Sequence, residues 1–266
     1  MDLIDSHCHL HFSEYDTDLP EVISASASAG VTRIVNVGTT LTDSQKAIEL
    51  ASQQTGMWAS VGVHPNDAGN LANDPSELEE LKSLLKQPKV VAVGEIGLDF
   101  YHNRTPRDVQ EKILRLQLEA GLEAGLPFIF HIRESFGSFW PIFDSYHPNS
   151  QPIKGVIHSF SAPPSELEQV IKRGLFIGLN GLITYAKDES WRESALLAPL
   201  DRILLETDAP FLAPAPDRQA RCEPKHTKVT AEFLAKLRGD SLENLASVTS
   251  ANSASLFGLS EEKLST

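Results

Sequence analysis

The stretch Leu3-Ile4-Asp5-Ser6-His7-Cys8-His9 begins the chain with apolar residues that run directly into two histidines. In an extended strand, residues two apart point to the same side. His7 and His9 can therefore direct both imidazoles at one point, as two ligands of a metal ion do. Taken alone, the pair is better explained as two solvated histidines that end an N-terminal strand, because short motifs match often by chance. The metal interpretation needs further ligands from distant parts of the chain.

Short apolar segments similar to the first recur along the chain and predict the strands of one sheet. They cover residues 3–5, 31–37, 57–63, 90–94, 128–130, 155–157, 175–178 and 203–205. Near-continuous apolar strands that alternate with helices are typical of a parallel sheet covered on both faces.

The segments between these strands carry helix signals. Asp74-Pro75-Ser76-Glu77 and Thr105-Pro106-Arg107-Asp108 each combine a capping residue, a proline and an acidic residue, as helix starts do. Further helices are expected at 165–173, 226–237 and 242–257, and the last of these is expected to cover the first strand.

Eight strand–helix units predict a (β/α)8 TIM barrel formed by a single domain over residues 1–266. An open doubly wound sheet is the alternative. No Gly-x-Gly-x-x-Gly and no phosphate loop follows the first strand, which counts modestly against that sheet. The proline-rich segment 209–224 follows the eighth strand, and we expect it to form an ordered loop beside the active site.

Composition limits the classes of partner. The 266 residues carry a formal net charge of -13, so a nucleic-acid substrate requires a local basic patch. Two cysteines and an N-terminus without signal-peptide features predict a reducing, cytoplasmic location. No segment is long and apolar enough to suggest a membrane span, and no membrane partner is expected.

Histidines and carboxylates fall at the ends of the predicted strands, where the rim of a barrel collects catalytic residues. The candidate metal ligands are His7, His9, Glu95, His131, His158 and Asp208. One catalytic zinc typically needs three protein ligands, whereas six ligands suit two ions bridged by a carboxylate. Glu95 lies centrally in the strand order and is the predicted bridge.

Three neighbouring residues have competing interpretations. His64 precedes a proline at the end of the third strand, and a structural role and a substrate contact are equally supported. Glu206 can bind a metal, but support of a neighbouring loop or ligand is favoured. Cys8 should point away from the histidines and act as a small core residue.

The motifs together resemble the TatD family of metal-dependent deoxyribonucleases, which belongs to the amidohydrolase superfamily. They are His7-Cys8-His9, Gly62-Val63-His64-Pro65, Gly94-Glu95-Ile96-Gly97-Leu98-Asp99, His131-Ile132-Arg133, His158-Ser159-Phe160-Ser161 and Glu206-Thr207-Asp208-Ala209-Pro210. The resemblance implies a TIM barrel in which His7, His9, Glu95 and Asp208 surround one ion and Glu95, His131 and His158 hold the other. Ile132, Ala162, Gln219 and Cys222 depart from the family pattern and leave the substrate preference open.

The resemblance also implies hydrolysis of DNA phosphodiester bonds by metal-activated water, with 3′–5′ exonuclease action on single strands or 3′ ends. Glu95 and Asp208 are the expected catalytic residues, with Asp208 as proton acceptor. Substrate contacts are expected from His64, Arg133, Arg218 and Arg221. The donor types fit two divalent ions, which are zinc, magnesium or manganese. A monomer is expected.

Two alternatives stay open from the sequence. The same binuclear site fits an amidohydrolase or lactonase that acts on a small molecule. A binding protein that retained the metals and lost catalysis is less favoured, because Glu95 and Asp208 are both present.

Overall fold

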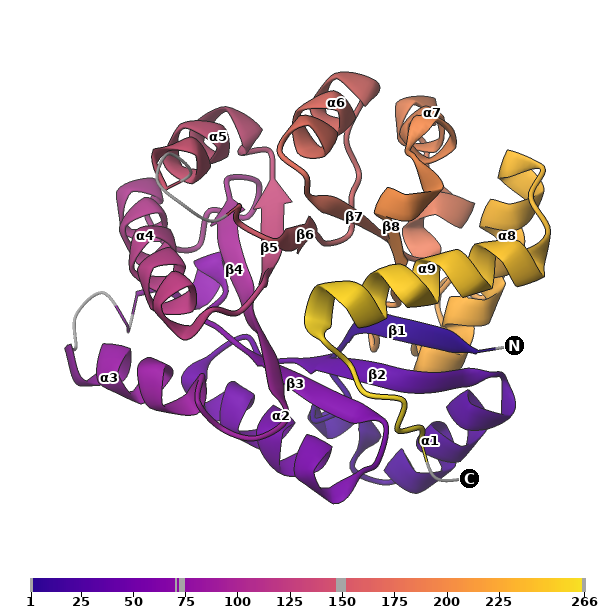
Figure 1. The fold of residues 1–266 in the computed structure, drawn as a ribbon, viewed down its shortest axis with the longest axis horizontal. Helices are drawn as coiled ribbons and strands as arrows, with labels where there is room; N and C mark the ends of the chain where they lie inside the picture. Colours follow the sequence, from indigo (N-terminus) through magenta and orange to yellow (C-terminus); the bar gives the residue numbers. More distant parts are fainter. Residues whose placement is uncertain (1, 70, 72–74, 147–151, 265–266) are drawn as a thin grey trace.

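The computed structural model describes residues 2–69, 71, 75–146 and 152–264, and its centre is a barrel of eight parallel strands (Figure 1). They are β1 (Leu3–Cys8), β2 (Val31–Val37), β3 (Met57–Val61), β4 (Val90–Asp99), β5 (Phe128–Arg133), β6 (Gly155–Ile157), β7 (Phe176–Leu179) and β8 (Ile203–Leu205). Each strand pairs in parallel with the next one along the chain. The predicted (β/α)8 barrel is confirmed, since a doubly wound sheet reverses its strand order at a switch point.

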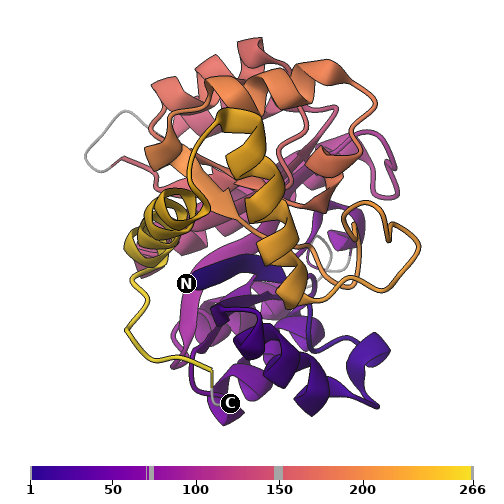
Figure 2. The same cartoon turned by 90° about the vertical axis from the view of Figure 1, so that its right-hand side faces the viewer.

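Helices connect the strands and surround the barrel (Figures 1 and 2). The α-helices are α1 (Leu19–Ser28), α2 (Leu41–Gln53), α3 (Pro75–Leu84), α4 (Arg107–Ala124), α5 (Phe136–Ser145), α6 (Pro164–Lys172), α7 (Glu189–Leu197), α8 (Thr227–Arg238) and α9 (Leu242–Phe257). The 3-10 helices are η1 (Ser13–Tyr15), η2 (Pro65–Asp67), η3 (Gly181–Thr184), η4 (Leu200–Arg202) and η5 (Pro224–His226). The prediction that residues 1–266 form one domain stays a prediction, and Asp74 lies outside the described residues.

Backbone and side-chain hydrogen bonds join the ends of β1 and β8 and so complete the barrel. Cys8 forms a parallel bridge with Ala209, and the Asp208 amide donates to the His7 carbonyl at 2.8 Å. The buried Asp5 carboxylate accepts from the Thr207 amide at 3.0 Å and from the Thr207 hydroxyl at 2.6 Å. These contacts fix the position of Asp208 beside the two histidines of β1.

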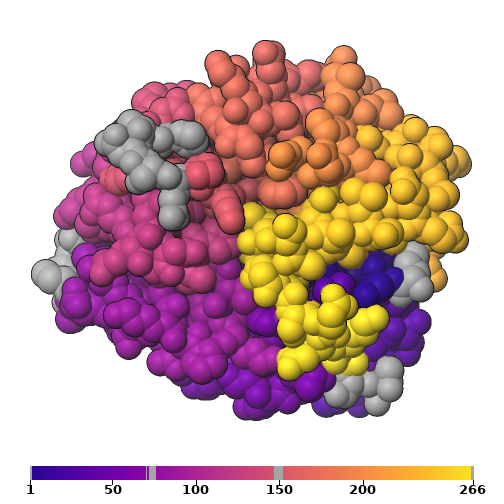
Figure 3. Space-filling view, in the orientation of Figure 1, coloured from indigo at the N-terminus to yellow at the C-terminus, as the bar shows by residue number. Residues whose placement is uncertain are grey.

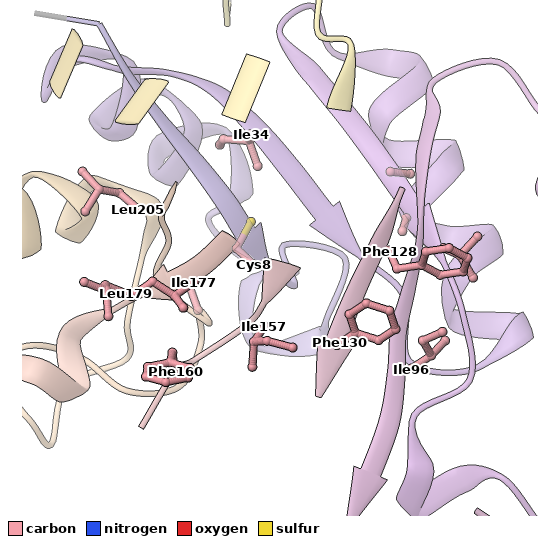
Figure 4. Close-up of a cluster of buried hydrophobic side chains, with 14 of the residues drawn as sticks. Cys8, Ile34, Ile96, Phe128, Phe130, Ile157, Phe160, Ile177, Leu179 and Leu205 are labelled. Atoms are coloured by element: carbon pink, nitrogen blue, oxygen red, sulfur yellow. The ribbon is translucent and has the colours of Figure 1, made fainter. Parts of the chain in front are cut away.

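Apolar side chains pack on both sides of the strands. An outer layer between the barrel and its helices includes Cys8, Ile34, Phe130 and Ile177 (Figure 4). Cys8 is fully buried there, which agrees with its predicted role as a small core residue. A second cluster draws on most of the strands and on the end of α9, and its members include Ile4, Val35, Trp58, Ala92, Ile129, Val156, Leu204, Leu256 and Phe257. The C-terminal helix therefore contributes directly to the core.

The position of α9 agrees with the prediction that residues 242–257 cover the first strand. It contacts β1 and β8, and the Ser250 hydroxyl donates to the carbonyl of Asp2 at 2.9 Å. In the space-filling view, the C-terminal region (yellow) lies against the N-terminal segment (indigo) (Figure 3). Among the described residues, no helix has both the length and the apolar character needed to span a bilayer.

Three strands run at least three residues further than the apolar segments predicted, and β7 runs one residue further. The predictions ended at residues 5, 94 and 130, whereas β1 continues to Cys8, β4 to Asp99 and β5 to Arg133. Polar residues interrupt the apolar pattern at these ends, and the pairing register shifts between Asp5 and Cys8 and between Val93 and Ile96. His7 and Glu95 therefore lie at irregular points of their strands, whereas His131 pairs in register with Gly97. All three still belong to strands, which hold a site more rigidly than loops do.

Candidate metal centre

Six side chains predicted as metal ligands meet at the carboxyl ends of the strands. His7 comes from β1, Glu95 from β4 and His131 from β5, while His9, His158 and Asp208 each lie within three residues of a strand end. His7, His9, Glu95 and His158 are buried, whereas Asp208 and His131 each expose 16% of the side chain. The cluster is therefore open to solvent on the side of Asp208 and His131.

One half of the cluster gathers two imidazoles and two carboxylates around the end of β1. The Nε2 atoms of His7 and His9 lie 3.2 Å apart. Asp208 Oδ1 lies 3.5 Å from His7 Nε2 and 3.4 Å from His9 Nε2, and Glu95 Oε2 lies 3.5 Å from His7 Nε2. Ligand-type atoms of His7, His9 and Glu95 lie within 4.8 Å of one another, which is close enough to share one cation.

The second half lies around the other oxygen of Glu95. Glu95 Oε1 is 2.7 Å from His131 Nδ1 and 3.3 Å from His158 Nε2. The two oxygens of Glu95 thus face different pairs of histidines. This arrangement matches the bridging position predicted for Glu95.

The outer nitrogens of three rings are held by hydrogen-bond acceptors. His9 Nδ1 lies 2.6 Å from the Val37 carbonyl, His131 Nε2 lies 3.3 Å from Asp99 Oδ2, and His158 Nδ1 lies 3.1 Å from Glu206 Oε1. Carbonyl and carboxylate oxygens only accept, so each outer nitrogen donates and the inner nitrogen faces the cluster.

The donor set therefore fits a metal centre. An inner nitrogen that hydrogen-bonds to Glu95 or Asp208 needs a proton for that bond, and a divalent cation can take the place of such protons. Burial of so many ionisable groups is expensive unless they pair or coordinate a metal.

Glu206 supports the second half and is fully buried. Its Oε1 atom accepts from His158 Nδ1, from the Ser159 amide at 2.7 Å and from Asn180 Nδ2 at 3.3 Å. Within the described part of the chain, neither Glu206 Oε2 nor His7 Nδ1 has a hydrogen-bond partner, although both are buried. Gly178 makes room for the carboxylate, because a Cβ there would lie 2.1 Å from Oε2.

The two carboxylates of the cluster are ionised at neutral pH. Burial alone would raise the pKa of Glu95, but His158, His131 and His7 together hold this pKa well below its usual range. Burial would also raise the pKa of Asp208, and His9, His158 and His7 lower it overall. Both groups can therefore act as anionic ligands or proton acceptors.

The histidines differ in basicity according to the groups that surround them. Burial lowers the pKa of His7, and the neighbouring His158 adds to this effect. Burial would lower the pKa of His158 as well, but Glu95 and Glu206 raise it to about 10. The pKa of His131 is also raised, because Asp99 and Glu95 outweigh the effect of burial.

His64 lies beside the cluster, with its Nε2 atom 3.8 Å from Glu95 Oε1. Its Nδ1 atom accepts a hydrogen bond from the Asn66 amide at 3.1 Å. Burial, together with the nearby His131, lowers the pKa of His64 to about 3, so the ring is neutral. A neutral ring that accepts through Nδ1 carries its proton on Nε2, which makes this atom a hydrogen-bond donor beside Glu95. Ligand-type atoms of His64, Glu95 and His131 also lie within 4.8 Å of one another.

The three predicted substrate-binding arginines have different surroundings. Arg133 and Arg218 are exposed, and their guanidinium carbons lie 4.2 Å and 3.9 Å from the ring centroids of Tyr101 and Tyr185. Arg221 instead donates to both oxygens of Asp18 at 2.9 and 2.6 Å and to Glu223 at 3.1 Å. The charge of Arg221 is thus offset by two carboxylates, and its role in substrate binding stays a prediction.

Asp99 and Asp5 were assigned no role from the sequence, although both support the cluster. Asp99 accepts from His102 Nδ1 at 2.8 Å and from Asn66 Nδ2 at 2.9 Å, in addition to its contact with His131. It lies four residues after Glu95, and this even spacing places two residues of a regular strand on one side. The predicted strand ended at residue 94, so this signal was missed.

Comparisons with known proteins agree with the site. A family model described as TatD related DNase matches residues 4–258. The uncharacterized metal-dependent hydrolase YabD of Bacillus subtilis is 34% identical over 96% of this chain and 98% of its own length. The 3′-5′ ssDNA/RNA exonuclease TatD of Klebsiella pneumoniae is 33% identical over 97% of this chain and 98% of its own.

A solved structure gives the same result. The TatD homolog YjjV from Escherichia coli superposes with a TM-score of 0.89 at 28% identity, over 97% of this chain and 98% of that one. The extent of these matches, together with the cluster of histidines and carboxylates on a barrel rim, establishes that the chain belongs to the TatD family of metal-dependent hydrolases.

Proposed function

We propose that this protein hydrolyses phosphodiester bonds of single-stranded DNA from the 3′ end. The observation that carries the proposal is the orientation of the histidine rings. The outer nitrogens of His9, His131 and His158 bind hydrogen-bond acceptors, so their inner nitrogens face Glu95 and Asp208 and can hold metal ions that activate water. The relative of 33% identity that is named as a 3′-5′ ssDNA/RNA exonuclease supports this substrate.

The chain has the residues to hold two divalent ions. His7, His9, Glu95 and Asp208 would hold one, and Glu95, His131 and His158 would hold the other. Nitrogen donors suit zinc, and carboxylates suit magnesium or manganese, so all three metals fit the mixed set. When bound, such ions lower the pKa of water and stabilise charge on phosphate oxygens.

Asp208 is the proposed proton acceptor. Its carboxylate is ionised at neutral pH, and its partial exposure lets it meet both water and substrate. The backbone bond from its amide to the His7 carbonyl holds the carboxylate next to the histidines of β1. Glu95 is proposed to keep the two halves of the cluster at a fixed separation.

Groups around the opening are proposed to bind the phosphate. His64 would donate from Nε2 to a phosphate oxygen, and Arg133 and Arg218 would attract the DNA backbone. Arg221 would act mainly through Asp18 and Glu223, by holding the loop that carries Arg218. Two arginines on the rim provide the local basic patch that a chain of net charge -13 needs for a DNA substrate.

The alternative is hydrolysis of a small amide or lactone at the same centre. A direct test incubates the metal-loaded protein with 3′-labelled and 5′-labelled single strands and, separately, with a panel of small amides and lactones. We expect stepwise shortening from the 3′ end in the wild type and loss of this activity in Glu95→Ala. Turnover of only the small molecules would contradict the proposal, as would full activity and two bound metals in Glu95→Ala.

We also propose a reducing compartment, namely the cytoplasm, as the place of action. Cys8 and Cys222 are free and buried, and such unpaired thiols persist where disulfides do not form.

A further inference from the structure

We propose that two groups of planar side chains, one beside each half of the cluster, stack with unpaired nucleobases next to the scissile phosphate. The first group is Phe12 with Phe211, and the second is Tyr101 with Arg133. This inference rests on the proposed function, because it assigns binding positions to the bases of the same DNA substrate.

The first group covers the β1 half of the cluster. The Phe12 ring stacks on the His9 ring, with centroids 4.8 Å apart and an angle of 13° between the planes. The Phe211 ring lies 6.4 Å from His9 and 6.3 Å from Phe12, in an edge-on orientation to both. Phe211 is 50% exposed, so part of its ring is accessible to a ligand.

The second group lies beside the other half. Tyr101 is 56% exposed, and its amide donates to Asp99 Oδ1 at 3.0 Å. The other oxygen of Asp99 contacts His131 Nε2 at 3.3 Å. Arg133, two residues beyond His131, stacks on the Tyr101 ring at 4.2 Å, so a flat aromatic and a flat cationic surface lie together.

The positions of the two groups indicate the occupant. His9 and His131 lie in different halves of the cluster, and Glu95 joins the halves. The first group contacts His9, and the second is linked to His131 through Asp99, so one group belongs to each half. Bases of single-stranded DNA offer free faces for stacking on aromatic rings and arginine, and this binding tolerates any sequence. Bases inside a duplex are already stacked on each other, so the arrangement favours unpaired ends.

The test compares Phe211→Ala and Tyr101→Ala on two single-stranded oligonucleotides. One carries ordinary bases on both sides of the scissile bond, and the other carries abasic residues at these two positions. We expect each variant to raise KM on the first substrate by about five- to tenfold, with kcat within about twofold, and to leave KM on the abasic substrate unchanged. Phe211→Tyr and Tyr101→Phe keep the rings and should restore the wild-type KM.

Leu122→Ala is the matched control, because Leu122 is a partly exposed apolar residue near the first residues of β4 and β5, at the opposite end of the barrel. Fluorescence anisotropy with a hydrolysis-resistant phosphorothioate oligonucleotide should show the same loss of affinity without relying on turnover. If Phe211→Ala and Tyr101→Ala raised KM equally on the ordinary and the abasic substrate, or if Leu122→Ala had the same effect as they do, the stacking proposal would be overturned. Failure of the wild type to cut either oligonucleotide would instead overturn the proposed function.

Discussion

The two halves of the candidate metal centre hold their histidines in different ways. In the β1 half, the outer nitrogen of His9 donates to a backbone carbonyl, and that of His7 has no partner among the described residues. In the other half, Asp99 stands behind His131 and Glu206 stands behind His158. A carboxylate behind a histidine raises its basicity as a ligand. The second half should therefore bind its ion more tightly once its histidines are deprotonated, and protons should compete with that ion more strongly.

Removal of one ligand from each half gives the largest expected effect. His9→Ala and His131→Ala should each lower the bound metal from about two ions to about one per chain. Activity should fall by more than the roughly 10–100-fold typical for loss of a supporting residue. Elemental analysis and nuclease assays check both values, and His226→Ala, which removes a histidine outside the cluster, serves as control. Retention of both ions in His131→Ala would contradict the assignment of that residue.

Neutralising Asp99 or Glu206 tests whether the two halves bind their ions independently. Asp99→Asn and Glu206→Gln keep the side-chain shape and should weaken the second ion by about 10–100-fold, with little effect on the first. Calorimetric titration of metal into the metal-free protein can resolve the two affinities. Asp43→Asn is the control, because Asp43 pairs with His11 and does not touch the cluster. An equal loss of affinity for both ions would show that Asp99 and Glu206 do not act on the second half alone.

The halves should also differ in their dependence on pH. His158 has a pKa of about 10 and must release a proton when the second ion binds, and the raised pKa of His131 adds to the competition from protons. In the first half, Asp208 raises the pKa of His9 against the effect of burial, but burial lowers the pKa of His7, so the first ion displaces fewer protons. Affinity therefore rises with pH for both ions, and we expect the affinity for the second ion to rise by about a further factor of ten per pH unit. Chelator competition between pH 6 and 8 measures both slopes, and equal slopes would remove this distinction.

The arginines give the smallest expected effects. Arg133 lies near the second half, and Arg218 lies on the loop after β8. Replacing either residue with alanine should reduce the slope of log DNA affinity against log salt concentration by about one. Arg221→Ala should change it less, because Asp18 and Glu223 already offset this charge. Anisotropy measured at several salt concentrations provides the values. A larger change for Arg221 than for Arg218 would show that Arg221 contacts the DNA directly.

The sequence by itself determined the barrel and placed the predicted ligands at one rim. Eight apolar segments in a strand–helix alternation predict parallel strands whose carboxyl ends meet at one rim. The histidines and carboxylates at these ends then follow from position along the chain, without knowledge of distances. The spacing of His7 and His9 predicts that both rings point to one side, and the structure brings their Nε2 atoms to 3.2 Å.

Only the tertiary structure decided which groups hydrogen-bond to the outer nitrogens of the predicted ligands and which arginines pair with carboxylates. Val37, Asp99 and Glu206 reach the histidines across neighbouring or distant strands, and strand pairing and barrel closure set these contacts. The same holds for Arg221, which meets Asp18 only because the loop after β8 returns beside α1. Side-chain partners of this kind depend on three-dimensional packing, whereas the order of strands and the residues at their ends are written along the chain.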